Sequence, residues 1–474
     1  MPIIGIQASQ DKSVPNAPTI GTATNVGSGR AYNNGRADVT FTAPSFDGKL
    51  PITSYTVTSS PGSFTASGAS SPLSVTGLQS NTAYTFTVTA TNAVGTSAAS
   101  SSSNSITATT IPQAPTIGSA TAGNASATVT FTGNANGGSA ITGYTATASP
   151  GGLTGQNSTS PITVNGLTNG TAYTFTVVAN NANGTSTASS ASNSVTPVNP
   201  VASSIEYLVV AGGGGGGAGA GANSAGGGGG AGGMQTGTLS VASSITITVG
   251  GAGSGGNYGA SVATNGSNSV CYSVTSTGGG AGGGYSPSTD TQGKNGGSGG
   301  GAPGTSLSNT AGTGTSGQGS NGGGNASGNS GGGGGGKAAV GGTGGSAGGN
   351  GGTGSASSIT GASVSYAGGG GGGAFGATGG TGTSGGGNGG NSNSFLHATA
   401  GTANTGGGGG GDLPYYAFEG FSIGKNGGSG IVVIAYADSN RALQSIGAGL
   451  TYTQPTRAGY RVYRFTGGTG TITF

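Results

Sequence analysis

Charged side chains, tryptophan, cysteine and histidine are all scarce in this chain of 474 residues. Lys, Arg, Asp and Glu make up 4% of the sequence, as 11 basic and 8 acidic residues, and there is no Trp, one Cys and one His. Charge this dilute cannot form the basic stripe that neutralises phosphates, so we expect no nucleic-acid partner. No apolar run is long enough for a transmembrane helix, which argues against membrane insertion. The first residues also lack the pattern of a secretory signal.

Single copies of histidine and cysteine leave little for catalysis. A Ser/His/Asp or Cys/His site would depend on His397, and Cys271 cannot form an internal disulfide. The stretch before Lys337 is similar to a phosphate-binding loop, but Ala338 stands where that loop needs a Mg²⁺-binding hydroxyl. The carboxylates lack the spacing of a calcium loop. We therefore predict a non-enzymatic protein without catalytic residues, cofactor or metal site.

Glycine, in contrast, is abundant and unevenly distributed. Of 115 glycines, 22 lie before residue 201, mostly as single residues, and most of the others lie in tracts between residues 201 and 430. This change of composition near residue 200 predicts a domain boundary.

An internal repeat occupies the part of the chain before that boundary. VPNAPTIGTAT, from Val14, recurs as IPQAPTIGSAT from Ile111, and SPLSVTGLQSNTAYTFTVTATNAVGTS, from Ser71, recurs as SPITVNGLTNGTAYTFTVVANNANGTS from Ser160. Within each unit, apolar and polar residues alternate in short stretches separated by Gly, Pro, Asn and Ser. The pattern predicts antiparallel strands with one buried face, and thus two β-sandwiches over residues 14–110 and 111–199.

The two units resemble fibronectin type III domains in their entry prolines and in the segment GL…TAYTFTV. The resemblance implies that Tyr84 and Tyr173 form the tyrosine corner, in which the hydroxyl bonds to upstream backbone. Phe41 and Phe131 would replace the core tryptophan usual in that family. Such modules are usually spacers. Carbohydrate binding through exposed rings such as Tyr32 or Phe64 is an alternative role. The entry prolines and two mid-strand tyrosines also carry the resemblance: Pro15, Pro18, Pro112, Pro115, Tyr55 and Tyr144.

Apolar strands open and close the glycine-rich region, which we place at residues 204–437. We expect Leu208 and Val209 to pair with Val432 and Val433, which would close the region into one domain. Glycine tracts of this kind form either a flexible linker or packed polyproline-II-like helices of about three residues per turn. We favour packed helices, because a linker needs neither bracketing strands nor interspersed aromatic residues. Hydrogen bonds between helices would then replace a hydrophobic core.

This region resembles the glycine-rich domains of phage tail-fibre adhesins and related phage structural proteins, in which polyglycine-II helices pack as a sandwich. The resemblance rests on the segments EYLVVAGGGGGG, the later GGGGGG tracts, GGSGIVVIAY and the terminal GYRVYRFTGGTGTITF. In those adhesins, segments between glycine tracts form exposed tips that contact host receptors. Segments beginning at Asn257, Gly284, Asn391 and Asp412 are the corresponding candidates here.

The segment 412–421 is the strongest of these candidates, because aromatic residues lie close to Asp412 and Glu419. Alternatively, its rings cap the end of the helix bundle. The candidate receptor-contact residues are Tyr415, Tyr416, Phe418 and Phe421.

Together these features predict an all-β protein with two sandwiches and a glycine-rich β/polyglycine-II domain. We expect residues 1–13 to be an attachment segment that binds other virion proteins, and residues 438–474 to form a C-terminal β-hairpin segment. The resemblance implies a phage fibre or decoration protein located on the virion, assembled as a homotrimer and able to contact a host surface glycan or protein. The alternatives are a bacterial cell-surface adhesin or extracellular matrix protein, and a passive head fibre without a receptor.

Overall fold

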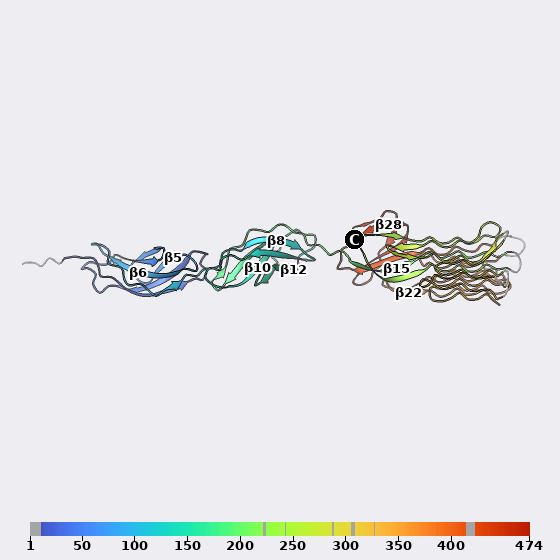
Figure 1. The fold of residues 1–474 in the computed structure, drawn as a ribbon, viewed down its shortest axis with the longest axis horizontal. Helices are drawn as coiled ribbons and strands as arrows, with labels where there is room; N and C mark the ends of the chain where they lie inside the picture. Colours follow the sequence, from blue (N-terminus) through green and yellow to red (C-terminus); the bar gives the residue numbers. More distant parts are fainter. Residues whose placement is uncertain are drawn as a thin grey trace, which may run out of the picture. The chain divides into compact units, whose positions relative to one another are not determined.

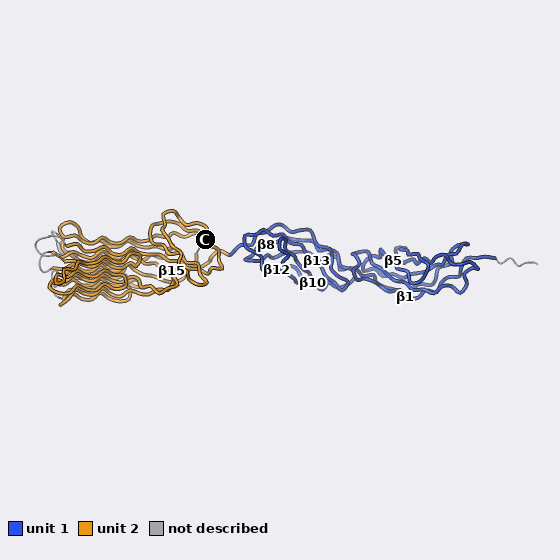
Figure 2. The backbone as a smooth tube through the Cα atoms, turned by 180° about the vertical axis from the view of Figure 1, so that it is seen from behind, with its two compact units in different colours: residues 1–199 blue, residues 200–474 orange. Residues whose placement is uncertain are grey.

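Strands form all the regular secondary structure of the described residues, which the computed structural model provides for 11–220, 224–241, 243–286, 289–304, 309–326, 328–413 and 422–474 (Figure 1). The fold is therefore all β, as predicted. No helix able to span a membrane occurs in this described part of the chain. The chain divides into two compact units, residues 1–199 and 200–474 (Figure 2).

The first unit contains two β-sandwiches built from the sequence repeat. In the first, one sheet has the order β1-β2-β5 and the other β4-β3-β6-β7, with strands at Thr19–Val26, Gly35–Thr42, Leu73–Leu78, Thr65–Gly68, Ser54–Ser60, Ala83–Thr91 and Ile106–Thr107. In the second, the orders are β12-β9-β8 and β11-β10-β13-β14, with strands at Ile162–Asn165, Ser126–Thr132, Thr116–Ala122, Thr154–Asn157, Ile141–Ser149, Thr174–Asn181 and Gly184–Thr185.

Alternation along the strands puts one face of each sheet into the core. On β6, Tyr84, Phe86 and Val88 are buried, and the threonines between them are half-buried. The predicted tyrosine corner is confirmed, because the Tyr84 hydroxyl accepts a hydrogen bond from Gln79 N at 3.0 Å, and the Tyr173 hydroxyl accepts one from Thr168 N at 3.1 Å.

Each sandwich core is built around a phenylalanine–tyrosine pair instead of a tryptophan. The ring centroids of Phe41 and Tyr55 lie 4.8 Å apart, and those of Phe131 and Tyr144 lie 4.6 Å apart. Phe41 and Phe131 are both buried, as their proposed replacement of the tryptophan requires.

A serine ladder, which sequence reasoning missed, follows the last long strand of each sandwich. In the first, Ser97, Ser100 and Ser103 donate their N–H groups to β6 carbonyls, and their hydroxyls accept hydrogen bonds from β6 N–H groups. Ser186, Ser189 and Ser192 do the same against β13. The partners recur every third residue, so these segments have the period of polyproline II and not that of a strand.

Two five-stranded sheets form one end of the second unit. Their orders are β16-β15-β24-β27-β26, at Met234–Ser240, Ser204–Val210, Ile431–Ala437, Tyr460–Gly467 and Thr451–Thr453, and β19-β18-β17-β28-β25, at Val274–Ser276, Ser269–Cys271, Ser244–Thr248, Thr469–Thr473 and Ser445–Ile446. Two short pairs, β20–β21 and β22–β23, lie at Gly284–Ser286, Thr289–Thr291, Ser355–Ser357 and Val364–Tyr366.

The strands that open and close the glycine-rich region pair as expected. Leu208 lies opposite Val433, and Val209 lies opposite Val432. In the C-terminal segment 438–474, β26 and β27 pair as neighbours, whereas β28 joins the other sheet beside β17. The C-terminal residues therefore complete both sheets of this unit, and their side chains contribute to its apolar core together with Val209, Ile245, Ile247 and Val432.

The glycine tracts run from these sheets as extended segments with a hydrogen-bond period of three. In the run 226–233, successive N–H groups donate in turn to carbonyls of 406–412, 277–283 and 332–335, at 2.8–3.0 Å. Its own carbonyls accept from 211–217, 298–301 and 370–373. None of the glycines in this described run has a positive φ, so the threefold extended chain is a left-handed polyproline-II helix.

Close backbone packing explains why these helices consist of glycine. A Cβ added at Gly228 would lie 2.1 Å from the Gly370 carbonyl oxygen, and one added at Gly229 would lie 2.1 Å from that of Gly214. The runs 212–217, 226–233, 331–336 and 368–373 are buried throughout. Hydrogen-bonded backbone thus forms the interior of this part of the molecule, and the packed-helix interpretation is confirmed over a flexible linker.

Candidate functional site: the loop end of the glycine-rich unit

The glycine helices turn back at an end of the second unit that lies away from its five-stranded sheets (Figure 1). The run that leaves β15 ends near Gly219, and the run that returns to β16 begins near Gly226. Both of these glycines donate their N–H groups to the carbonyl oxygen of Asp412, at 3.1 and 2.9 Å. We call this end the tip, and define it by residues 257–262, 284–285, 391–398, 412–413 and 422–423.

All four segments that the sequence singled out meet at the tip. The Tyr258 and Tyr285 rings lie 5.6 Å apart, and Tyr258 N donates to the Ser422 carbonyl at 3.0 Å. Asp412 contacts the segment that begins at Asn391 through its side chain. The structure thus brings together segments that are up to 165 residues apart, from Asn257 to Ser422.

Asp412 is the buried anchor of the tip. Its side chain is 2% exposed, and its Oδ1 accepts a hydrogen bond from Ala398 N at 3.3 Å. Its Oδ2 lies 3.4 Å from His397 Nδ1, whereas the histidine side chain is 58% exposed. This carboxylate holds the 391–398 loop against the glycine bundle, because a buried charge requires such partners.

The loop from Asn391 to Leu396 is closed by its own hydrogen bonds. Asn391 N donates to the Leu396 carbonyl at 2.8 Å, Leu396 N donates back at 3.2 Å, and Ser394 N donates to Asn391 Oδ1 at 2.7 Å. Within this loop Phe395 has a φ of +56°, which is unusual for a bulky residue. Phe395 and Leu396 are 57% and 60% exposed. The loop therefore presents two large apolar side chains to solvent in an ordered conformation.

The four candidate receptor-contact residues, Tyr415, Tyr416, Phe418 and Phe421, lie outside the described residues. Their flanks are described: Leu413 is buried, and Ile423 is 44% exposed. The sequence favoured this aromatic segment, so it ranked the loop with Phe395 and Leu396 lower. The one signal for that loop was the interruption of a glycine tract by NSNSFLHATA, from Asn391.

The tip offers few groups for chemistry. Across the described residues, no group of three or more His, Cys, Asp or Glu side chains could hold a metal ion. Cys271 lies in the sheets, not at the tip, and burial raises the pKa of its thiol to about 12. The tip is therefore a candidate contact surface.

Comparison with known proteins identifies the domains. The fibronectin type III domain model matches residues 23–106 and 112–195, and the glycine-rich domain model matches residues 185–437. Among solved structures, the FN1–FN3 domains of chicken CNTN1 are 18% identical with a TM-score of 0.24, over 42% of this chain and 80% of that one.

Domains A168–A170 of titin are 19% identical with a TM-score of 0.23, over 39% of this chain. The match spans 62% of that titin fragment, less than two thirds of its length. No curated protein matches the sequence. Two fibronectin type III domains precede the glycine-rich region, and the chain belongs to the glycine-rich domain family.

Proposed function

We propose that this protein is a structural and adhesive component of a phage particle, bound to other virion proteins through its N-terminal segment and to a host surface glycan or protein through the tip. Fibronectin type III and glycine-rich domains suit a structural or adhesive extracellular protein, and modules of the first kind are typically non-catalytic. The virion location, the adhesive role and assembly as a homotrimer are the further steps of the proposal.

The observation that carries the adhesive role is the ordered exposure of Phe395 and Leu396. When a partner buries large exposed apolar side chains, the free energy of the complex falls by about 25 cal/mol per Å² of apolar surface. The loop hydrogen bonds around Asn391 fix their position beforehand, which lowers the entropic cost of binding. The described flanks of the aromatic segment 414–421, buried Leu413 and exposed Ile423, lie at this end of the unit.

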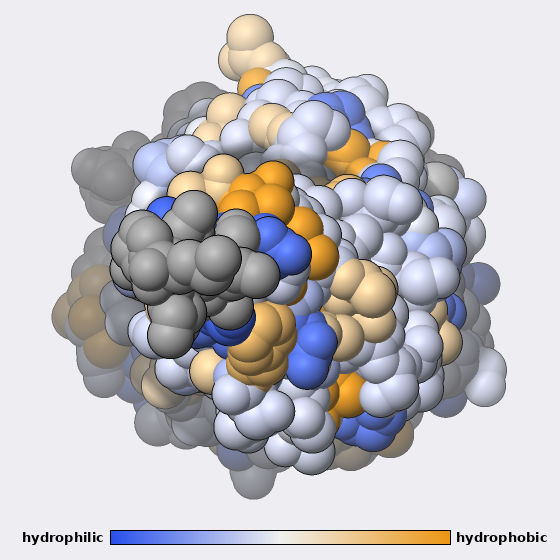
Figure 3. Space-filling model, turned by 90° about the vertical axis from the view of Figure 1, so that its left-hand side faces the viewer, coloured by the Kyte–Doolittle hydropathy of each residue, from blue (hydrophilic) through white to orange (hydrophobic). Residues whose placement is uncertain are grey.

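The N-terminal end of the first sandwich supports the attachment role. Ser13 is already part of this sandwich, since its N–H donates to the Gly48 carbonyl at 3.1 Å. Val14, Phe46 and Val94 are 40%, 38% and 49% exposed at the loops around it. Viewed from this side, the surface is mostly pale and carries small apolar patches (Figure 3).

In the second sandwich, the equivalent loops are used for docking. Ile111 N donates to the Arg30 carbonyl at 3.0 Å, and the Asn183 carbonyl accepts from Gly29 N at 2.8 Å, which joins the second sandwich to the first. Val14 and Val94 occupy the matching positions of the repeat. The first sandwich therefore offers, in a more apolar form, the surface with which the second one docks.

Infection with phage that encodes Phe395→Ser/Leu396→Ser tests the adhesive role. We expect adsorption to host cells to fall at least tenfold, and a similar fall for Tyr415→Ala/Tyr416→Ala. Val340→Ser is the matched control. Val340 is 59% exposed, but it follows the glycine run 331–336 at the end near the sheets, away from the tip. Unchanged adsorption for both of these variants would leave the passive-fibre alternative. Absence of the protein from purified particles by mass spectrometry would contradict the virion location, and a monomer in light scattering would contradict the trimer.

A further inference from the structure

A polar depression on the second sandwich is independent of the tip. It has a volume of about 320 Å³, near the lower limit of small-molecule sites, and lies over β10, β11 and β13. Gly143 lies among its lining residues, and a Cβ added there would meet only the Asn157 carbonyl, at 3.8 Å. The depression is lined by Thr142, Gly143, Tyr144, Thr145, Gln156, Asn157, Ser158 and Asn180.

The internal repeat shows that this depression is specific to the second sandwich. Five of its eight lining residues differ from their counterparts in the first sandwich, although the repeat is otherwise closely matched. The counterparts of Gly143, Gln156, Asn157, Ser158 and Asn180 are Ser54, Ser67, Gly68, Ala69 and Thr91. The second copy thus loses one side chain at the strand position of Gly143 and gains three amides around it.

Two amides of the depression have free hydrogen-bonding groups, those of Gln156 and Asn180, whereas the Asn157 amide is engaged with Pro161 and Ser158. In the first sandwich, the Thr56 and Ser67 hydroxyls are hydrogen-bonded at 2.8 Å. In the second, which is described in full, the side chains of Thr145 and Gln156 make no hydrogen bond. Asn180 Oδ1 accepts from Thr185, and its amide nitrogen has no partner there. The Gln156 amide can therefore both donate and accept, and the Asn180 amide nitrogen can donate.

Charge restricts the ligand that these groups can bind. Residues 111–199 contain no Lys, Arg, Asp, Glu or His. An ionic ligand would lose its hydration there without gaining an ion pair. A neutral sugar matches this site, because its hydroxyls both donate and accept and its apolar ring face can lie against the half-buried Tyr144. Phe64, which the sequence suggested for this role, lies in the first sandwich and is likewise half-buried, with its ring near Tyr84.

We infer that the second fibronectin type III domain carries a binding site for a neutral oligosaccharide in the depression around Gly143, Gln156 and Asn180. The spacer would thus add a glycan contact to the particle, separate from the tip.

A printed array of neutral oligosaccharides, with sialylated and sulfated ones for comparison, tests this on the full chain. We expect binding to neutral glycans only, and saturation-transfer NMR then measures the affinity for the strongest of them. Gln156→Ser/Asn180→Thr, which converts the site to its counterpart, should weaken binding at least tenfold. Gly143→Val should do the same by filling the depression, while its branched side chain suits a strand. The control Ser67→Ala, in the first sandwich, should bind normally.

Binding that survives both site variants, binding of acidic glycans only, or no binding would each overturn the inference. The tip variant Phe395→Ser/Leu396→Ser should bind the neutral glycan like the unmodified chain. Loss of glycan binding in that variant alone would assign the sugar to the tip. Thermal unfolding of each variant checks that the sandwich remains folded.

Discussion

The only histidine of the chain, His397, lies with its Nδ1 3.4 Å from Oδ2 of Asp412, whose side chain is 2% exposed. The other carboxylate oxygen accepts from the backbone N–H of Ala398 at 3.3 Å. One buried carboxylate therefore fixes two successive residues of the exposed loop that carries Phe395 and Leu396.

Removal of this carboxylate should loosen the tip without unfolding the unit. In Asp412→Ala, the buried N–H of Ala398 loses its acceptor, at a cost of about 1–3 kcal/mol. We expect amide exchange of residues 391–398 to accelerate at least tenfold in mass-spectrometric measurements, while the sheets exchange as before. Asp412→Asn keeps an oxygen acceptor and should exchange more slowly than the alanine variant. Equal exchange in all three proteins would show that the loop does not depend on Asp412.

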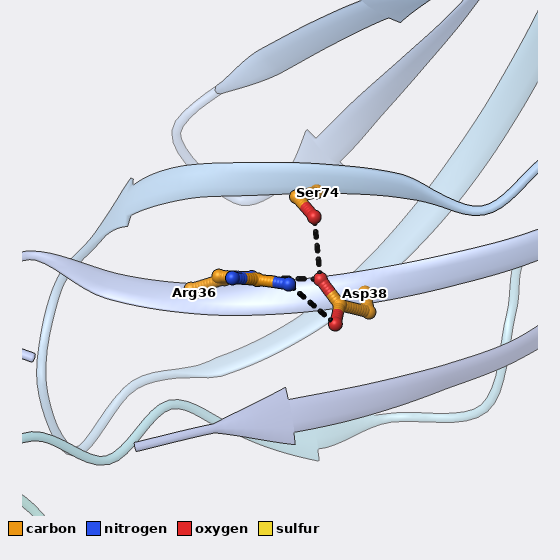
Figure 4. A network of polar contacts seen from close by, with 3 residues as sticks. All are labelled: Arg36, Asp38 and Ser74. Atoms are coloured by element: carbon orange, nitrogen blue, oxygen red, sulfur yellow. Dashed lines mark hydrogen bonds and ion pairs between the residues drawn. The ribbon is translucent and has the colours of Figure 1, made fainter. Parts of the chain in front are cut away.

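The outer face of the first sandwich carries a pH-sensitive network of Arg36, Asp38 and Ser74 (Figure 4). Arg36 donates two hydrogen bonds of 2.8 Å to the carboxylate, and Ser74 donates one of 2.6 Å. The hydrogen bonds from Arg36 lower the pKa of Asp38. A lowered folded-state pKa stabilises the fold above the ordinary aspartate pKa of about 4, and this stabilisation is lost as the pH falls through the lowered value.

The Asp38→Asn variant should therefore lose little stability, and mainly above the ordinary aspartate pKa of about 4. Because the Arg36 and Asp38 side chains are 37% and 29% exposed, we expect only a small loss of unfolding free energy at pH 7, decreasing with salt. Urea unfolding at pH 7 and pH 2 measures the difference, which should be smaller at pH 2. The Ser74→Ala variant keeps the ion pair and should lose less stability than Asp38→Asn does. A difference that grows in acid would contradict this sign.

Cys271 should make the second unit less stable in alkali. Burial raises the pKa of its thiol from 9.0 to about 12, so the folded chain holds the proton more strongly than the unfolded chain does. The unfolding free energy of the second unit is therefore unaffected by this thiol below pH 9, and it falls as the pH rises toward 12. Cys271→Ala should lose less stability than the unmodified chain between pH 8 and pH 10.5, measured by urea unfolding. If the unfolding free energies of the two proteins fell equally with pH, the thiol would not be buried.

The same burial should protect the thiol from reagents. At pH 8 almost every folded thiol would be protonated, so Ellman's reagent should react with the folded protein hardly at all and with the urea-unfolded protein at once. Rapid reaction of the folded protein would place Cys271 at an accessible surface.

Local patterns predicted the parts of this fold that bury side chains. Alternation around Tyr84 and the repeated GL…TAYTFTV segment indicated the sandwiches, and apolar residues near Leu208 and Val433 indicated the pair of strands that closes the glycine-rich unit. The serine ladders were missed because their period of three occurs among many serines, and so leaves no apolar pattern.

The order of the glycine helices could not be predicted, because a glycine tract has no side chains that specify a neighbour or a register. The sheets at one end and anchors such as Asp412 at the other set which runs lie together. Alanine occurs inside some runs, and at one of these positions its methyl group meets an apolar surface. Ala231 packs with Leu208 and Met234.

A single methyl group should therefore disrupt the bundle where the backbones are in contact. In Gly229→Ala, the new Cβ would lie 2.1 Å from the Gly214 carbonyl oxygen, and neither helix can move away without breaking hydrogen bonds on its other sides. We expect a loss of about 3 kcal/mol or more, seen as a lower melting temperature or as insoluble protein.

Gly251→Ala is the matched control for this substitution. Gly251 is exposed, lacks a positive φ, and has no neighbouring atom within 4 Å of an added Cβ. The same chemical change should alter stability there by no more than about 0.5 kcal/mol. Because both variants replace a glycine of the unfolded chain in the same way, the difference between their melting temperatures reports the packing alone. Equal melting temperatures would mean that the glycine runs do not form a close-packed interior in solution.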